Sequence, residues 1–414
     1  MNLCPSLNPS PSPSSISELP TWLVQRLEDA GGAVPFRTYM EWVLHDPLHG
    51  AYGSGKLRIG PAGDFATSAS LGPDFAALLA PQIAEWLEEL SAAAFPAPVE
   101  AAAPLALVET GPGEGSLALQ LAEALAENWP ELALRTELVL VEPNAGMAER
   151  QRSLLQSSPL PCRWTSFSEL AAAPVRGVVL AHEVLDALAV ERIEWDGATW
   201  RQQQVVLDRS SPARPSLRLE PGAPLEPAVA AQLEPLGLLP ASPQLPPGWC
   251  SELHPGLEPW LAAAAAGVVA GQLLVIDYAL EAWRYYAPLR SAGTLMAYRA
   301  QQASGDPLQE PGAWDLTAHL CIESLERAAK GCGWQSLGQC RQGEALLALG
   351  LAERLHGLQQ GSAADLASLL ARREALLRLV DPAALGDFRW LAYGRQVSLD
   401  KPRFSREPGP PATG

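Results

Sequence analysis

Charged residues, and positive charge above all, are scarce in this chain of 414 residues. Asp, Glu, Lys and Arg make up 18% of the chain, against roughly 25% in typical soluble domains. The 29 Lys and Arg are outnumbered by 46 Asp and Glu, which gives a net charge of −17. Such a chain repels phosphate backbones and anionic lipid, so we expect no nucleic-acid partner and no membrane insertion. A partner with a basic segment would be attracted.

Cysteine motifs and apolar runs long enough to span a membrane are also lacking. The six cysteines are scattered, and no Cys-x-x-Cys pair or zinc-type Cys/His spacing occurs. We therefore expect reduced thiols and no metal site. The stretch Trp260 to Ile276 runs 17 residues without a charge and contains glycines, which favours a buried helix followed by a strand over a membrane span. Residues 1–17 contain no Lys, Arg or apolar run, so we expect no targeting peptide and a cytoplasmic protein.

The apolar residues that are present, 48% of the chain, suffice for a large core. From residue 105 onward, short apolar runs alternate with segments of helical periodicity such as 116–128. Strands that are apolar on both faces and separated by helices predict a parallel sheet covered on both sides, hence an α/β, Rossmann-like core. The predicted strands are 105–109, 137–142, 163–165, 177–181 and 273–277.

Composition also predicts how the chain is divided. Residues 1–17 are rich in Pro and Ser and read as a flexible lead-in, and 401–414 as a flexible tail. Helical spacing of apolar residues predicts an N-terminal helical segment over 18–104. A hairpin pattern at 190–207, followed by a Pro-dense stretch with little expected regular structure, predicts an inserted lobe over 190–259. The core is then expected over 105–189 and 260–400.

The sharpest motif is the Gly-rich loop over residues 109–116 (ETGPGEGS), which follows a predicted strand and opens a predicted helix. Gly111, Gly113 and Gly115 let the backbone approach a ligand closely, and Pro112 stiffens the loop. Glu142 ends the next predicted strand, where an acid can accept both hydroxyls of a ribose. The motif predicts a site for a nucleoside-containing cofactor.

The loop's spacing and charge discriminate between cofactors. NAD sites use G-x-G-x-x-G, whereas this loop has G-x-G-x-G. The flanking Glu109 and Glu114 would repel a pyrophosphate. S-adenosylmethionine has no phosphate and carries a positive sulfonium and ammonium, so the acidic loop favours it. A nucleotide-dependent enzyme and a plain structural turn stay open as alternatives.

Three acids follow predicted strand ends. Glu183 and Asp186 come after 177–181, and Asp277 ends 273–277. The carboxyl ends of parallel strands face the ligand in open α/β sheets, so these acids are candidates for the catalytic edge. The alternative is that Glu183 and Asp186 are merely an acidic first turn that caps a helix.

Several motifs, in one order from about Phe36 to Phe388, resemble the MidA-like family of S-adenosylmethionine-dependent methyltransferases, whose mitochondrial members assist assembly of respiratory complex I. The motifs are Phe36-x-x-Tyr39-Met40, Asp46-Pro47-x-x-Gly50-x-Tyr52, Gly63-Asp64-Phe65-x-Thr67-Ser68, Glu109-x-Gly111-Pro112-Gly113-x-Gly115-x-Leu117, Glu183-x-x-Asp186-Ala187, Ile276-Asp277-Tyr278, Gly293-Thr294-Leu295-x-x-Tyr298 and Asp315-Leu316-Thr317-x-His319.

The resemblance implies a Rossmann-like methyltransferase core, with the N-terminal segment across its cofactor cleft and the inserted lobe on the substrate side. It implies an arginine of a complex I-type protein subunit as the substrate, since carboxylates can hold a guanidinium bidentately. The catalytic candidates are Glu183, Asp186 and Asp277. The implied contacts to S-adenosylmethionine are Asp64, Thr67, Glu109, Gly111, Pro112, Gly113, Gly115 and Glu142.

Two departures from the family pattern bear on turnover. His182 stands where the family usually has Asn, and Gln301 lies where a His is expected. They motivate the alternative of an assembly factor that binds S-adenosylmethionine without transferring its methyl group. The sequence does not indicate the oligomeric state.

Overall fold

The computed structural model describes most of the chain, namely residues 18–55, 57–60, 63–64, 66–93, 103–211, 214–238, 245–359 and 366–406. The predicted lead-in (1–17), the end of the predicted tail (407–414) and Phe65 lie outside the described residues. The prediction of a flexible tail is wrong for 401–406. There the 3-10 turn η6 (Arg403–Ser405) buries Phe404, whose ring packs 5.2 Å from that of Trp390.

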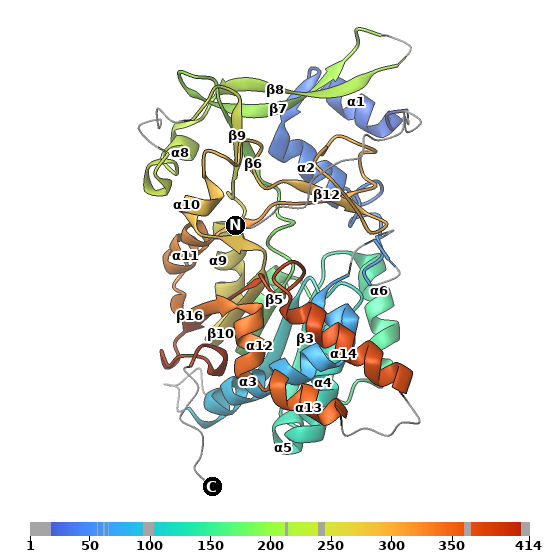
Figure 1. Ribbon diagram of the computed structural model, residues 1–414, viewed down its shortest axis with the longest axis vertical. Coiled ribbons are helices and arrows are strands. Elements are labelled where there is room, and N and C mark those ends of the chain that lie inside the picture. The colour runs from blue at the N-terminus through green and yellow to red at the C-terminus, as the bar shows by residue number, and fades with distance from the viewer. Residues whose placement is uncertain are drawn as a thin grey trace.

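A seven-stranded sheet forms the lower half of the molecule in Figure 1, in the order β16-β17-β10-β5-β2-β3-β4. Five neighbouring strands are parallel, as predicted, and β17 runs antiparallel to β10 and β16. The carboxyl ends of the parallel strands therefore share one edge. The strand bounds are β2 (Leu105–Thr110), β3 (Thr136–Val141), β4 (Cys162–Thr165), β5 (Val175–His182), β10 (Val268–Asp277), β16 (Gln335–Arg341) and β17 (Arg389–Arg395).

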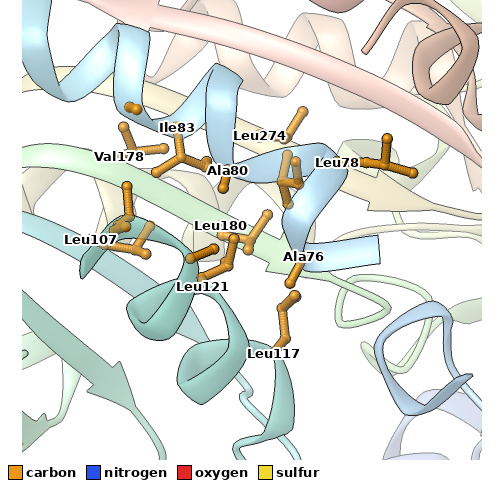
Figure 2. Close-up of a cluster of buried hydrophobic side chains, with 14 of the residues drawn as sticks. Ala76, Leu78, Ala80, Ile83, Leu107, Leu117, Leu121, Val178, Leu180 and Leu274 are labelled. Atoms are coloured by element: carbon orange, nitrogen blue, oxygen red, sulfur yellow. The ribbon is translucent and has the colours of Figure 1, made fainter. Parts of the chain in front are cut away.

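Helices cover both faces of this sheet, which confirms the α/β, Rossmann-like fold. On one face α3 (Asp74–Ala92) and α4 (Ser116–Asn128) interlock with the strands, and Figure 2 shows Ile83 and Leu121 facing Leu107 and Val178. On the other face lie α7 (Phe167–Ala172), α9 (Leu257–Gly267) and α11 (Ile322–Gly331). The apolar stripe of α3 packs on β2, β5 and β10. This helix therefore belongs to the core, whereas the division expected at residue 104 placed it over the cleft.

The upper half of Figure 1 is built on antiparallel strands. Strand β7 (Trp200–Asp208) pairs with β6 (Glu191–Trp195), β8 (Ser216–Pro224) and β1 (Ala33–Pro35), and β6 pairs with β9 (Trp249–Leu253). The Pro-dense stretch therefore contains two strands that were not expected. Because β1 joins this sheet, the N-terminal segment and the insertion form one unit.

Most of the stretch 279–321, which was expected in the core, packs in the upper unit, although Ala279 and Leu320 are buried against the core. The strands of this stretch are β11 (Ala279–Leu280), β12 (Met296–Arg299), β13 (Gln302–Ser304), β14 (Asp315–Thr317) and β15 (Leu320–Cys321). Tyr285, Leu295 and Leu316 are buried against residues of the N-terminal segment or the insertion. The prediction differs because the side chains of this stretch are buried against the insertion and the N-terminal helices. These partners are distant in the sequence, and local periodicity does not reveal them.

The remaining helices complete the two units. Asp74, at the start of α3, forms ion pairs with Arg354 and Arg372 and so holds α13 and α14 to the core. No helix in the described part of the chain is long and apolar enough to span a membrane. The bounds are α1 (Thr21–Asp29), α2 (Phe36–His45), η1 (Ser68–Leu71), α5 (Pro130–Ala133), α6 (Ala145–Leu154), η3 (Leu155–Ser157), α8 (Pro227–Ala230), η4 (Glu234–Leu236), α10 (Ala282–Tyr285), α12 (Gln342–Ala348), α13 (Leu351–Gln359) and α14 (Leu366–Val380).

Candidate active site

A cavity of about 900 Å³ lies between the two units, at the carboxyl ends of β2, β3 and β5. Its volume falls in the range of small-molecule sites, roughly 300–1,000 Å³. The core contributes the Gly-rich loop, residues 141–147 and residues 182–184. The upper unit contributes Glu41, His45 and Tyr52, and Thr67 closes one side. The cavity therefore exists only where the two units meet.

The Gly-rich loop turns through backbone conformations that favour glycine. Gly111, Gly113 and Gly115 have φ angles of 57°, 55° and 87°, all in the left-handed region. A Cβ on Gly111 would lie 3.0 Å from the Val184 side chain, so a larger residue would crowd Val184 there. Gly111, Gly113 and Pro112 line the cavity. Gly115 instead caps α4 and does not line it.

Glu142 follows β3 and lines the cavity. Its Oε1 accepts a hydrogen bond from the Asn144 N–H (2.8 Å), and its Oε2 accepts one from Gln151 Nε2 (2.9 Å). Gln151 also donates to the Gly113 carbonyl (2.8 Å), which ties the carboxylate to the Gly-rich loop. Burial raises the pKa of Glu142, so a hydrogen-bond donor in the cavity would stabilise its charged form.

Glu109 lies near the end of β2, is only 4% exposed and lines the cavity. Its Oε2 has no hydrogen-bond partner among the described residues, and burial raises its pKa to about 8. The Ala118 backbone N–H donates a hydrogen bond to the carboxyl, but the buried Oε2 without a partner is destabilising unless a cation or donor approaches it. The ammonium and sulfonium of S-adenosylmethionine are such groups, so Glu109 and the glycine turns fit this cofactor.

The two N-terminal residues implied as cofactor contacts differ in position. Thr67 lines the cavity and caps the turn η1. Asp64 does not line the cavity, which departs from the prediction. Its carboxylate accepts hydrogen bonds from the N–H groups of Arg58 (2.9 Å) and Ala300 (3.2 Å), and the N–H of Gln301 donates to its carbonyl (2.8 Å). Asp64 and Gln301 therefore join the N-terminal loop to the β12–β13 turn.

The three acids predicted at the catalytic edge do meet, but only Glu183 lines the cavity. Its backbone has φ = 55°, a strained conformation for a residue with a side chain. Asp277 is fully buried: its Oδ2 accepts hydrogen bonds from the N–H groups of Leu185 (3.0 Å) and Asp186 (3.3 Å), and its Oδ1 from Tyr278 (2.8 Å). Asp277 thus fastens the loop that carries Glu183, in contrast to its predicted contact with the substrate.

Asp315 is a fourth acid that the sequence analysis did not select. It begins β14, is 3% exposed and accepts a hydrogen bond from the Tyr52 hydroxyl. Its other oxygen has no partner in the described part of the chain. The signal was present, because both Tyr52 and Asp315 stand in the motifs that carry the family resemblance.

We call Glu183, Asp186, Asp277 and Asp315 the acidic cluster. Burial raises the pKa of Glu183 to about 8 and those of Asp277 and Asp315 to about 7. Burial, followed by the charges of Asp277, Asp315 and Glu183, raises the pKa of Asp186 well above its ordinary value. Among the described residues, no Lys or Arg forms an ion pair with these four, and no group of side chains could hold a metal ion. Within the described part of the chain, the cluster therefore lacks a countercharge from Lys or Arg.

Comparison with known proteins decides the family. Residues 78–340 match the model of the S-adenosyl-L-methionine-dependent methyltransferase family Methyltransf_28. The chain belongs to this family. Its cofactor is S-adenosylmethionine, as predicted, and the MidA-like resemblance is confirmed. The cofactor supplies an electrophilic methyl group on a positively charged sulfur.

Relatives of this methyltransferase cover most of the chain. It is 26% identical over 391 residues to a Drosophila melanogaster protein named protein arginine methyltransferase NDUFAF7 homolog, mitochondrial, covering 87% of this chain and 81% of that one. It is 24% identical over 426 residues to the human protein arginine methyltransferase NDUFAF7, mitochondrial, covering 96% and 88%. The predicted cytoplasmic location is contradicted by these names, which describe mitochondrial proteins.

A solved structure supports the cofactor assignment. A Burkholderia thailandensis protein, bound to S-adenosyl-homocysteine, superposes on this methyltransferase with a TM-score of 0.78 and 27% identity. The match covers 93% of this chain and 94% of that one. Both units of the molecule thus have a counterpart in a protein that holds the demethylated cofactor.

Proposed function

We propose that this methyltransferase transfers a methyl group to an arginine side chain of a protein. The observation that carries the proposal is the acidic cluster. It is buried beside the cofactor cavity, and no Lys or Arg among the described residues pairs with it. A guanidinium keeps its positive charge at any physiological pH and offers donors in a planar fork that matches carboxylates. The names of the NDUFAF7 relatives support the same substrate class.

The residues of the cluster take different roles in this proposal. Glu183 faces the cavity and contacts the guanidinium, which fixes one nitrogen near the methyl group. Asp186 and Asp315 lie behind Glu183 and do not line the cavity, so they act through their negative charge. Asp277 keeps the Glu183 loop in place. Tyr52 lies between the cavity and Asp315, and its hydroxyl hydrogen-bonds to that carboxylate.

On the cofactor side, we propose that Glu142 accepts the ribose hydroxyls and Glu109 faces the ammonium. Thr67, Gly111 and Gly113 complete the cofactor walls. The upper unit, built from the N-terminal segment, the insertion and residues 279–321, then lies on the substrate side. By family resemblance the target is a subunit of a complex I-type assembly, and the net charge of −17 favours a basic segment around the target arginine.

The test is methyl transfer from labelled S-adenosylmethionine to basic peptides that differ only in carrying Arg or Lys at the centre. We expect label in the Arg peptide alone, and loss of label with Glu183→Gln. Glu137→Gln is a matched control, because Glu137 lies on β3, pairs with Arg163 and does not line the cavity. Label in the Lys peptide would refute arginine specificity.

The non-catalytic alternative predicts binding of S-adenosylhomocysteine with no transfer to any peptide or subunit. The structure weakens one of the two observations that motivated this alternative. Gln301 hydrogen-bonds to the Gly63 carbonyl (2.9 Å) and does not line the cavity, so that departure lies outside the site. His182 does line the cavity and therefore deserves a role of its own.

A further inference from the structure

His182 ends β5 at the cavity wall and contacts Glu183. Its Nε2 lies 3.2 Å from the Glu183 Oε1, and the imidazole packs against the Phe75 ring at 5.3 Å. The residue is 9% exposed, and the described residues offer its Nε2 no well-directed hydrogen bond. Without a proton on either atom the two lone pairs would repel at this separation, so a proton carried by Nε2 or by Oε1 would make the contact favourable.

We propose that His182 and Glu183 form a dyad that receives the proton released in methyl transfer, with Glu183 as the base and His182 as the positioning residue that holds the proton on it. The proposal rests on the proposed arginine substrate. It assigns a task to the residue at which this chain departs from the Asn usual in the family.

The reaction leaves one proton to place. The target nitrogen forms its bond to the methyl carbon, the sulfur–methyl bond breaks with its electron pair going to sulfur, and the N–H proton passes to the Glu183 carboxylate. The methylated guanidinium keeps one positive charge, so atoms and charge balance. A hydrogen bond from the protonated carboxyl to His182 Nε2 then stabilises the proton on Glu183 while the product leaves.

The charged groups around the dyad support this direction of the hydrogen bond. Glu109 lies on the neighbouring β2, Asp277 on β10, Asp186 on the loop after β5 and Asp315 at the start of β14. The carboxylate of Asp74 on α3 is paired with Arg354 and Arg372. Burial lowers the pKa of His182 to about 3 and raises that of Glu183 to about 8. In the proposed dyad the neutral imidazole carries its proton on Nδ1, so that Nε2 accepts a hydrogen bond from the protonated carboxyl.

The first experiment compares His182→Leu and His182→Asn with wild type in the arginine-peptide assay, as a function of pH. We expect S-adenosylhomocysteine affinity within twofold of wild type and kcat lower by about tenfold or more. In His182→Leu the rising limb of kcat/KM should move to lower pH, because the protonated Glu183 loses its acceptor. His356→Asn, on the distant α13, is the matched control. If the rising limb of His182→Leu does not move, His182 only packs against its neighbours. If the limb moves to higher pH, His182 donates a hydrogen bond to Glu183 instead of accepting one. Either result overturns the proposal.

A second measurement does not depend on turnover. The shared proton should give a far-downfield proton NMR resonance in wild type with S-adenosylhomocysteine bound, absent from His182→Asn and from Glu183→Gln. If wild type shows the resonance but methylates no arginine, the substrate assignment fails and the dyad stands. If both variants keep the resonance, or wild type lacks it, the dyad is refuted whatever the substrate.

Discussion

Replacing Glu142 with Gln tests the cofactor side of the cavity most directly. Glu142 uses one lone pair on each oxygen for Asn144 and Gln151, which leaves further lone pairs free to accept hydrogen bonds from the cavity. The substitution keeps the shape of the side chain but removes the charge and one acceptor. If the ribose hydroxyls bind here, the loss is about that of a charge-assisted hydrogen bond, roughly 1.5–3 kcal/mol.

That free energy corresponds to roughly 10- to 150-fold weaker binding of S-adenosylhomocysteine, measured by isothermal titration calorimetry. Because burial raises the pKa of Glu142, the wild-type affinity should also improve with pH as the carboxylate loses its proton, and Glu142→Gln should remove that part of the pH dependence. Glu137→Gln serves as the control, because Glu137 lies on β3, the strand that precedes Glu142, and pairs with Arg163 away from the cavity. A Glu142→Gln affinity within twofold of wild type, in a protein with unchanged circular dichroism, would refute the ribose assignment.

Other substitutions test the rest of the site. Gly113→Val should abolish S-adenosylhomocysteine binding in calorimetry, because φ = 55° disfavours a β-branched residue and its Cβ would approach Ile59 to 2.8 Å. Retained affinity in a folded variant would contradict the assignment of the Gly-rich loop to the cofactor. Asp186→Asn should lower methyl transfer at least about tenfold, or 1.4 kcal/mol, with cofactor binding almost unchanged; loss of binding instead would place Asp186 in the cofactor pocket. Glu109 and Glu183 hold protons in the folded state up to about pH 8 and lose them near 4.5 when unfolded, so the free energy of unfolding should fall as pH rises between these values. Each group contributes up to about 1.4 kcal/mol per pH unit, and chemical denaturation of Glu109→Gln should show a shallower dependence; an equal slope would contradict the burial argument.

The core of the fold was predictable because its signals are local. The strands before the Gly-rich loop and Glu142 are apolar on both faces, and the helix 116–128 has the bounds of α4. The upper unit was less predictable. Strand β1 has only three residues, and β8 is largely exposed with an irregular pattern, so neither shows a period in the sequence. Their pairing with β7 is a long-range choice that local patterns do not encode.

The site could also be predicted only where its signals are local. Residues at strand ends, such as Glu109 and Glu183, could be placed because parallel strands share an edge. Asp315 follows no core strand and reaches the cluster only through the upper unit, so its position required the three-dimensional structure. Asp64 and Asp277 show the converse. Both stand in motifs, yet their carboxylates hold backbone N–H groups, and a sequence does not distinguish an acid that binds a ligand from one that binds a loop.

The link between Asp64 and the β12–β13 turn has a kinetic consequence. Ile59 lies over Gly113, and Asp64 fixes the neighbouring Arg58 and Ala300 by hydrogen bonds. The chain crosses between the two units at residues 182–190, at Asp277 and before α11, so several chain connections join them. We therefore expect exchange of spent for fresh cofactor to depend on displacement of this short N-terminal segment. Weakening the Asp64 link should therefore speed cofactor exchange and shorten the residence time while leaving the chemical step untouched.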